Sequence, residues 1–342
     1  MAGCAIGCVG LCIRSSNIRF TKGMDMVNIG YTLSSEEFGP QALADHARLA
    51  EDAGFTFASI SDHFHPWLDS QGHSPFVWAT LGAISQTTSQ LLIGTGVTCP
   101  TLRIHPAIIA QAAATAGDLL PGRFYLGVGT GEALNEHILG QQWPPLSLRQ
   151  DMLAEAVDLI RSLWSGNYVT EQGRFYRVDN ARIYTLPAEL PPIHVAASGP
   201  ESAVLAAQVG DGLISTSPDS ETVDAFQTNG GSGPVIGQLT VCWGANEDEQ
   251  AEVALNQWAN SAIPGQLSQE LALPVYFEQA AGLVTTEKIK ESMACGPDVE
   301  QIHTRIKEYI DAGFTHVYLH QIGPDQEQFI RMAEREIMPR YA

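Results

Sequence analysis

The chain has 342 residues, of which 44% are hydrophobic and 16% are charged, as in a large globular protein with a full core. Its 38 acidic and 18 basic residues give a net charge of −20, which excludes a surface attractive to nucleic acid or anionic membranes. No apolar stretch after residue 25 is long enough to cross a bilayer, and the six cysteines show no disulfide framework. We therefore expect a cytoplasmic protein that acts on a small molecule.

Residues 1–25 differ from the rest of the chain. Their apolar run is short and has no basic start, which argues against a secretory signal. Cys4, Cys8 and Cys12 narrowly miss a common iron–sulfur spacing, and no supporting fold precedes them. We expect residues 1–25 to be a disordered extension or the product of an upstream start codon, and residues 26–342 to form one domain.

From residue 27 onward, apolar runs of strand length alternate with amphipathic segments. Strands are expected at residues 27–31, 55–60, 91–95, 124–128, 193–197, 212–214, 235–243 and 316–319. Helices are expected at residues 41–53, 78–87, 107–119, 149–164, 203–209, 299–312 and 326–338. Eight strands alternating with helices predict a single α/β domain, a (β/α)8 TIM barrel. Residues 167–192 and 246–287 interrupt the alternation, and we expect them as insertions on the carboxyl-terminal face.

The fourth expected strand runs directly into Gly129-Thr130-Gly131, and Glu132 follows at once. Glycines after a strand let the backbone approach a flat or phosphorylated ligand closely. A carboxylic acid at this position is a candidate proton donor or acceptor. The alternative is a plain strand-to-helix turn, with Glu132 in the first helical turn. The run is not the dinucleotide-binding fingerprint, because the third glycine of that motif is absent.

Polar or unusual side chains follow five different strands, and none of them precedes its strand. They are His63, Cys99, Glu132, Ser198 and Thr216, after the second to the sixth expected strand. In a closed barrel the carboxyl ends of the strands meet at one mouth, where barrel enzymes have their sites. The sequence therefore predicts one site assembled from distant segments.

Asp62 and His63 are the best acid–base candidates. Histidine titrates near neutral pH, and a neighbouring aspartate can tune it or bind a cofactor. The alternative is a pair that closes the strand and caps a helix. His63 and His65 would share one face of a continuing strand, but no third ligand has a convincing spacing, so we expect no metal. Trp67 is either a wall of the site or part of the core.

Two further features bear on the chemistry. Glu36 and Glu37 follow the first strand, and we expect one of them to face the mouth; the alternative is a solvated pair at a helix start. A serine hydrolase is not indicated, because the sequence lacks the G-x-S-x-G elbow.

Four motifs carry a resemblance to a known family. They are Ser61-Asp-His-Phe-His-Pro-Trp67, Cys99-Pro-Thr-Leu-Arg103, Pro106-Ala-Ile-Ile-Ala-Gln111 and Gly127-Val-Gly-Thr-Gly-Glu-Ala-Leu-Asn-Glu136. On these motifs the chain resembles the dehydrogenases of the bacterial-luciferase-like superfamily that use the deazaflavin coenzyme F420, among them those acting on glucose 6-phosphate and on secondary alcohols. The resemblance begins near residue 29 and leaves residues 1–25 without a counterpart.

The resemblance implies a barrel, usually a homodimer, with a deazaflavin ring across the mouth. The positions that match cofactor contacts are Asp62, Cys99, Thr130, Gly131, Asn135, Ser198, Gly199, Glu201 and Ser202. Gly96–Val97 matches a non-proline cis peptide bond that supports the ring.

The resemblance also implies a reaction. A hydroxyl-bearing carbon donates a hydride to C5 of the ring, the substrate oxygen loses a proton and a ring nitrogen gains one. His63 is placed to take the first proton and Glu132 to give the second, although which residue serves which proton stays open. Trp67 and Glu36 match positions that hold the substrate oxygen.

The substrate positions depart from the sugar-phosphate enzymes. Those enzymes hold the phosphate with two lysines and an arginine, and the matching positions here are Asp219, Ser268 and Lys290, while Thr216 is retained. An aspartate repels a phosphate, so we expect Thr216 and Lys290 to contact an uncharged or weakly polar alcohol, or the matching carbonyl compound. Two alternatives are an FMN-dependent monooxygenase of the same superfamily and a deazaflavin carrier without catalysis.

Overall fold

The computed structural model describes residues 27–263 and 265–341. The predictions for residues 1–25, including the three early cysteines and the domain start at residue 26, lie outside the described residues. Within the described part of the chain, no helix combines the length and apolarity needed to cross a membrane.

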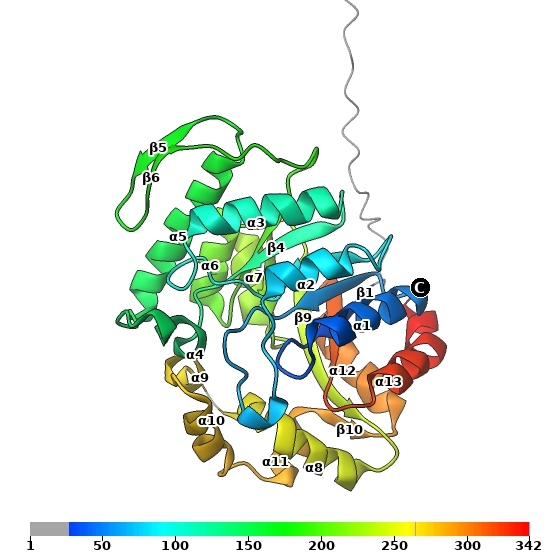
Figure 1. Cartoon of the computed structure of the whole chain (residues 1–342). Helices are drawn as coiled ribbons and strands as arrows, with labels where there is room; N and C mark the ends of the chain where they lie inside the picture. Colours follow the sequence, from blue (N-terminus) through cyan, green and yellow to red (C-terminus); the bar gives the residue numbers. More distant parts are fainter. Residues whose placement is uncertain (1–26, 264, 342) are drawn as a thin grey trace, which may run out of the picture.

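Eight parallel strands close into a barrel, which confirms the predicted fold (Figure 1). Around the barrel they are β1 (Asn28–Leu33), β2 (Phe57–Ile60), β3 (Leu92–Thr95), β4 (Phe124–Val128), β7 (Ile193–Ala196), β8 (Gly212–Ser215), β9 (Val235–Trp243) and β11 (His316–Gln321). Closure occurs at β9, because this strand pairs with β8 on one side and with β11 on the other. Every neighbouring strand pair in the ring is parallel, so all eight carboxyl ends point to one mouth.

One helix follows each barrel strand and covers its outer face. These helices are α1 (Pro40–Asp52), α2 (Val77–Ile84), α3 (Pro106–Leu119), α5 (Leu146–Leu163), α6 (Pro200–Val209), α7 (Ser220–Thr228), α12 (Val299–Asp311) and α13 (Gln326–Met332). The sequence prediction missed α7, whose N-terminus is capped by the Asp219 carboxylate, which accepts hydrogen bonds from the backbone N–H groups of Glu221 and Thr222. A short helix, α4 (Ala133–Glu136), lies between β4 and α5.

The expectation of insertions on the carboxyl-terminal face holds for one segment and not for the other. The segment after β9 joins a strand to a helix, so it lies at the mouth; it contains α8 (Glu247–Trp258), α9 (Leu267–Glu270), α10 (Pro274–Ala281), α11 (Thr286–Ser292) and the extra strand β10 (Ala294–Gly296). We call residues 247–293 the lid segment. The hairpin β5–β6 (Val169–Gln172 and Arg177–Ala181) joins α5 to β7 and packs along α5 through Glu155, which accepts hydrogen bonds from the backbone N–H groups of Phe175 and Tyr176. Figure 1 shows the lid segment and the hairpin at opposite ends.

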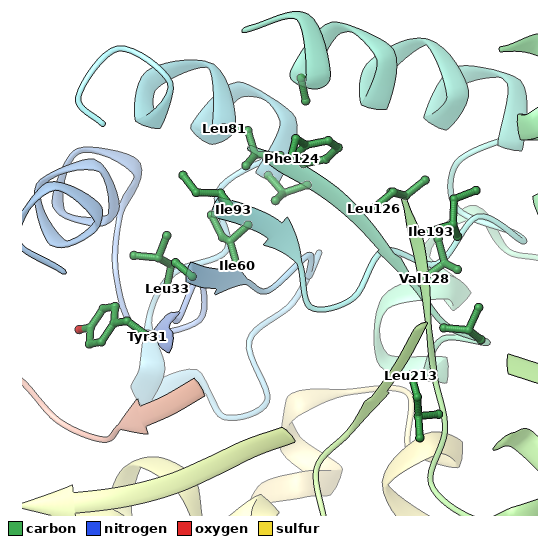
Figure 2. Close-up of a cluster of buried hydrophobic side chains, with 14 of the residues drawn as sticks. Tyr31, Leu33, Ile60, Leu81, Ile93, Phe124, Leu126, Val128, Ile193 and Leu213 are labelled. Carbon is green, nitrogen blue, oxygen red and sulfur yellow. The ribbon is translucent and has the colours of Figure 1, made fainter. Parts of the chain in front are cut away.

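The strands carry two apolar layers because alternate residues point to opposite faces. Outward-facing side chains such as Leu33, Ile60 and Leu126 pack under the helices, and Leu81 of α2 meets them there (Figure 2). The interior is filled by a smaller buried cluster of Phe57, Tyr125, Ile214, Ile236 and Tyr318.

Glycines on neighbouring strands make room for the interior rings. A Cβ atom on Gly30 would lie 2.5 Å from the Phe57 ring, and one on Gly94 would overlap the Tyr125 ring. The two interior rings of Phe57 and Tyr125 are therefore each matched by a strand residue with no side chain.

Gly94→Ala should lower the free energy of unfolding by about 1–3 kcal/mol, because the new methyl group overpacks the barrel interior. Gly82→Ala on α2 is the matched control, since its Cβ would meet nothing within 4 Å. That control should be neutral or more stable by up to about 1 kcal/mol, because alanine favours a helix over glycine. Urea unfolding of both variants measures the difference, and equal stability would contradict the packing described here.

Candidate active site

His63 and Glu36 meet at the mouth from neighbouring strands. His63 follows β2 and Glu36 follows β1, and the His63 Nε2 atom lies 3.4 Å from Glu36 Oε1. Glu36 is buried, and its other carboxylate oxygen accepts hydrogen bonds from Ser61 Oγ at 2.6 Å and Ser34 Oγ at 3.2 Å. Of the two alternatives for this acidic pair, the structure shows a buried position facing the mouth and not a solvated helix start.

The tautomer of His63 follows from its second contact. His63 Nδ1 lies 3.1 Å from the carbonyl oxygen of His65, and a carbonyl can only accept, so Nδ1 carries a proton. In the neutral ring, Nε2 then has the free lone pair. The neutral imidazole can therefore accept a proton at Nε2. The Glu36 carboxylate, 3.4 Å from that atom, can form an ion pair with the ring once the ring is protonated.

Trp67 connects His63 to the lid segment. Its ring centroid lies 4.9 Å from that of His63 and 5.1 Å from that of Phe277 on α10. The same loop holds the lid segment through Gln71, whose Nε2 donates to the carbonyl oxygen of Gln257 at 2.8 Å. Trp67 is half-buried and lies against the imidazole, so it is a wall of the site rather than part of the barrel core.

Asn135 ties the loop after β2 to the loop after β4. Its Oδ1 accepts hydrogen bonds from the backbone N–H groups of Phe64 at 2.8 Å and His65 at 3.2 Å. Its Nδ2 donates to Glu132 Oε2 at 3.4 Å. One amide thus brings the segment that carries His63 beside the segment that carries Glu132, as the sequence predicted.

Glu132 occupies the N-cap position of α4, but its side chain makes no capping hydrogen bond. The carboxylate is half-buried. It is therefore available for contact with a ligand, and its place at the start of α4 is also that of the plain strand-to-helix turn.

Asp62, Arg103 and Glu136 form a buried charged cluster that the sequence did not reveal. Arg103 Nη2 donates to Asp62 Oδ1 at 2.8 Å, and Thr98 Oγ1 donates to Asp62 Oδ2 at 2.7 Å. The backbone N–H of Arg103 donates to Glu136 Oε2 at 2.6 Å, and its Nε lies 3.5 Å from Glu136 Oε1. Both carboxylate oxygens of Asp62 already have protein partners, and its expected cofactor contact stays a prediction.

Burial raises the pKa of Glu136 from its usual 4.5 to about 7. Arg103 opposes this shift only in part, because its one guanidinium is shared between Glu136 and Asp62. Only the position of Glu136, one helical turn after Glu132, could have indicated this cluster.

Small side chains line the opposite half of the mouth. The Gly96–Val97 peptide bond is cis, which confirms that expectation. A Cβ atom on Gly129 would lie 2.8 Å from Val97 Cγ2 and 3.4 Å from Ala196 Cβ. Val97 and Ala196 are both partly exposed, so the mouth presents a shallow apolar floor here.

Cys99 and Gly131 are in contact above that floor. Gly131 has a positive φ of 78°, and a Cβ atom on it would lie 2.6 Å from Cys99 Sγ. Cys99 Sγ lies 3.0 Å from Thr101 Oγ1. Burial raises the pKa of Cys99 well above its usual value, so it remains a thiol at neutral pH. Thr130 is partly exposed beside them.

Ser198, Gly199, Glu201 and Ser202 surround the N-terminus of α6. The Ser198 backbone N–H donates to Ser202 Oγ at 3.2 Å, and Ser202 Oγ donates to the carbonyl oxygen of Gly199 at 3.0 Å. Gly199 is the N-cap and makes no side-chain cap, and Glu201 is exposed. The first N–H groups of a helix favour an anionic group.

The two expected substrate residues lie differently. Thr216 extends β8 at the mouth with an exposed side chain, and its carbonyl oxygen accepts a hydrogen bond from the Tyr309 hydroxyl at 3.1 Å. Lys290 of α11 forms ion pairs with Asp248 and Glu247 of α8. No contact joins the Lys290 ammonium to His63, Glu36 or Trp67 among the described residues. The contact of Lys290 with substrate stays a prediction.

No group of three or more His, Cys, Asp or Glu side chains within residues 27–263 and 265–341 has an arrangement that could hold a metal ion.

Residues 24–316 match the family described as luciferase-like monooxygenase. The chain is a member of the luciferase-like monooxygenase family. It is 38% identical over 327 residues to the F420-dependent glucose-6-phosphate dehydrogenase of Microbacterium testaceum strain StLB037, covering 92% of this chain and 97% of that protein. It is also 38% identical over 332 residues to the enzyme of the same name from Nocardia farcinica strain IFM 10152, covering 93% and 98%.

A solved structure extends the likeness to alcohol chemistry. An F420-dependent secondary alcohol dehydrogenase in complex with an F420-acetone adduct superposes with a TM-score of 0.87 and 32% identity, covering 93% of this chain and 99% of that one. Family members at this similarity therefore include enzymes named for sugar phosphates and for secondary alcohols.

Glu136→Gln should become more stable relative to the original protein as pH rises. The folded-state pKa of Glu136 is raised, so its stabilising contribution is complete below about pH 4.5 and is lost as pH approaches about 7. The difference in unfolding free energy between variant and original should therefore grow by about 1–3 kcal/mol between about pH 5 and about pH 8. Denaturant titrations at both pH values measure it.

The matched control is Glu327→Gln, which changes an exposed carboxylate on α13. Its unfolding curve should follow that of the original protein at both pH values, because exposed ion pairs contribute little. Parallel pH profiles for the Glu136 variant and the original protein would show that this carboxyl is not kept neutral by burial.

Proposed function

We propose that this protein is an F420-dependent oxidoreductase that transfers a hydride between the CH–OH carbon of an alcohol or sugar-like substrate and C5 of the deazaflavin. One observation carries the proposal: His63, whose Nε2 is the proton-accepting nitrogen of the neutral ring and lies 3.4 Å from Glu36 Oε1, is at the barrel mouth on a loop that Asn135 ties to Glu132. The identity to enzymes named for this coenzyme supports the same chemistry.

The residues at the mouth fit a flat, tailed cofactor. Val97, Gly129 and Ala196 pack so closely that a Cβ on Gly129 would clash with Val97, so the backbone here carries little side-chain bulk. The N-terminus of α6 beside Ser198 suits the anionic tail of the coenzyme. When bound, the deazaflavin would supply a hydride acceptor at C5. We propose that it is held by the residues that the family resemblance matches to cofactor contacts: Asp62, Val97, Cys99, Thr130, Gly131, Asn135, Ser198, Gly199, Glu201 and Ser202.

The side chains have separate tasks in this proposal. His63 accepts the proton of the substrate hydroxyl at Nε2, and Glu36 stabilises the resulting imidazolium. Trp67 excludes water from the imidazole and holds the substrate oxygen through its indole N–H. Glu132 exchanges the second proton, and the division of the two protons between His63 and Glu132 remains a prediction.

The charges at the mouth favour an uncharged substrate. Asp219 caps the N-terminus of α7. Arg103 forms ion pairs with Asp62 and Glu136, and Lys290 forms ion pairs with acidic residues of α8. Both of these cations, Arg103 and Lys290, already pair with carboxylates, and a phosphate forms its strong contacts with a free cation. We therefore propose an alcohol without a phosphate group.

We also propose that the protein is a cytoplasmic homodimer. The family resemblance supports the dimer, and light scattering on the purified protein tests it.

Mixing the purified protein with oxidised F420 and an alcohol should bleach the visible absorption band of the coenzyme, and glucose 6-phosphate should be a poor substrate. His63→Ala should lower kcat by about 100-fold or more, because it removes the proton acceptor. His303→Asn on α12, whose imidazole contacts Tyr341, is the control and should retain turnover.

Unchanged turnover in His63→Ala would overturn the assignment of the base. The family description favours one alternative, an FMN-dependent monooxygenase. Oxygen consumption with reduced FMN and substrate, without any bleaching of F420, would establish that alternative instead.

A further inference from the structure

The interior of the mouth is polar along one side. On β1, β9 and β11 the core residues alternate with residues that face the barrel interior, since Leu33, Leu239 and Leu319 pack outward while Ile236 and Tyr318 pack inward. By the same alternation the interior positions nearest the mouth are polar. We call this set the polar arc: Thr32, Gln238, Thr240 and His320.

Strand register places the members of the polar arc side by side. His320 of β11 is paired with Thr240 of β9. Tyr31 is paired with Leu319, so the next residue, Thr32 of β1, lies beside His320. In-register residues of parallel strands point to the same face, so Thr32, Thr240 and His320 point into the mouth. Gln238 lies two residues before Thr240 on the same face of β9, at the level of Tyr318.

The polar arc has unused hydrogen-bonding capacity. Thr32 Oγ1 is buried and has no hydrogen-bond partner among the described residues. His320 Nε2 is also buried without a hydrogen bond in this part of the chain, and its one ion-pair contact there is Glu37 Oε2 at 3.5 Å. Gln238 Nε2 lies 3.3 Å from His320 Nδ1, and within the described chain no partner is found for the Thr240 hydroxyl. Gln238 and Thr240 are partly exposed. Because buried polar groups normally have partners, this set is suited to a ligand that brings hydroxyl groups.

His320 is held in place as firmly as His63. Its Nε2 lies 3.5 Å from Glu37 Oε2, and its ring lies edge-on to Trp258 of the lid segment with centroids 4.4 Å apart. Glu37 is fixed in turn, because its Oε1 accepts a hydrogen bond from the backbone N–H of Gly323 at 3.1 Å.

The two histidines have a spacing that suits one small molecule. Glu36 and Glu37 are consecutive, and each faces a histidine, on the strands that flank β1. Strands two apart in a sheet are separated by about 10 Å, so His63 and His320 lie within reach of one short substrate. The nearby carboxylates make the arc unsuitable for an anion.

We propose that the polar arc binds a second hydroxyl group of the substrate, so that the substrate is an uncharged diol, polyol or sugar without phosphate. This inference rests on the proposed function, and it assigns Glu37 as a positioning residue for His320. The reaction itself is unchanged: one hydroxyl-bearing carbon loses a hydride to F420 and a proton to the protein, and the second hydroxyl only binds.

The test compares 1,2-propanediol with 2-propanol, which differ by one hydroxyl group. The original protein should have a kcat/KM for the diol at least about tenfold above that for the alcohol, as expected for one or two extra hydrogen bonds. Thr240→Val and Thr32→Val remove a hydroxyl at constant size, and each should lower this ratio by about 3–30-fold. Thr304→Val on α12, whose hydroxyl donates to the Glu300 carbonyl, is the control and should keep the original ratio.

The ratio separates a binding role from a structural one, because a structural defect lowers kcat/KM for both substrates equally. An unchanged ratio in both variants, or an original protein that prefers 2-propanol, would overturn the inference. Calorimetric titration of the diol into the enzyme loaded with reduced F420 gives a second readout, since no hydride acceptor is present, and the diol should bind each variant more weakly. Turnover of 2-propanol without a diol preference would remove only this inference, whereas F420 binding without turnover of any alcohol would remove the proposed function.

Discussion

Closure of the barrel at β9 is the constraint on which the site depends. This strand pairs with β8 near its start and with β11 along most of its length, and its end pairs with β10, which follows the lid segment. Because closure forces eight carboxyl ends into one ring, residues as distant as Glu36 and His320 come to share a mouth. The interior rings fill the middle of the barrel, with glycines opposite two of them, and they separate His194 and His316 at the amino-terminal end from the polar side chains at the mouth.

The mouth has two chemically different halves. Val97, Gly129 and Ala196 form an apolar floor with almost no side-chain bulk, and the N–H groups of α6 lie beside it. The strands β9, β11 and β1 present hydroxyl, amide and imidazole groups instead. The first half suits a flat ring with an anionic tail and the second suits a small hydroxylated molecule, with the imidazole of His63 between the two.

Much of this arrangement could be predicted from the sequence, because strand and helix periodicity is a local signal. The eight barrel strands and the convergence of His63, Glu132 and Thr216 at one mouth followed from alternation alone. The strand β10 was missed because it has three residues and exists only through pairing with the end of β9. The helix α7 was not predicted, although Asp219, which the resemblance matches to a phosphate position, acts here as its N-cap.

Pairings across the chain were beyond sequence reasoning for a different reason. Arg103 and Glu136 are the last residues of two of the motifs that carry the family resemblance. Nothing in the local sequence indicates that the Arg103 guanidinium pairs with both Asp62 and Glu136. The same holds for His320, which lay just beyond the last expected strand and is placed beside Glu37 only by barrel closure. Such groups become functional candidates only when burial shows that water cannot satisfy them, because a buried polar atom must find its partner in the protein or in a ligand. In this barrel the Thr32 hydroxyl, which has no partner among the described residues, lies beside His320 at the mouth, and this is why a hydroxylated ligand accounts for it better than the core does.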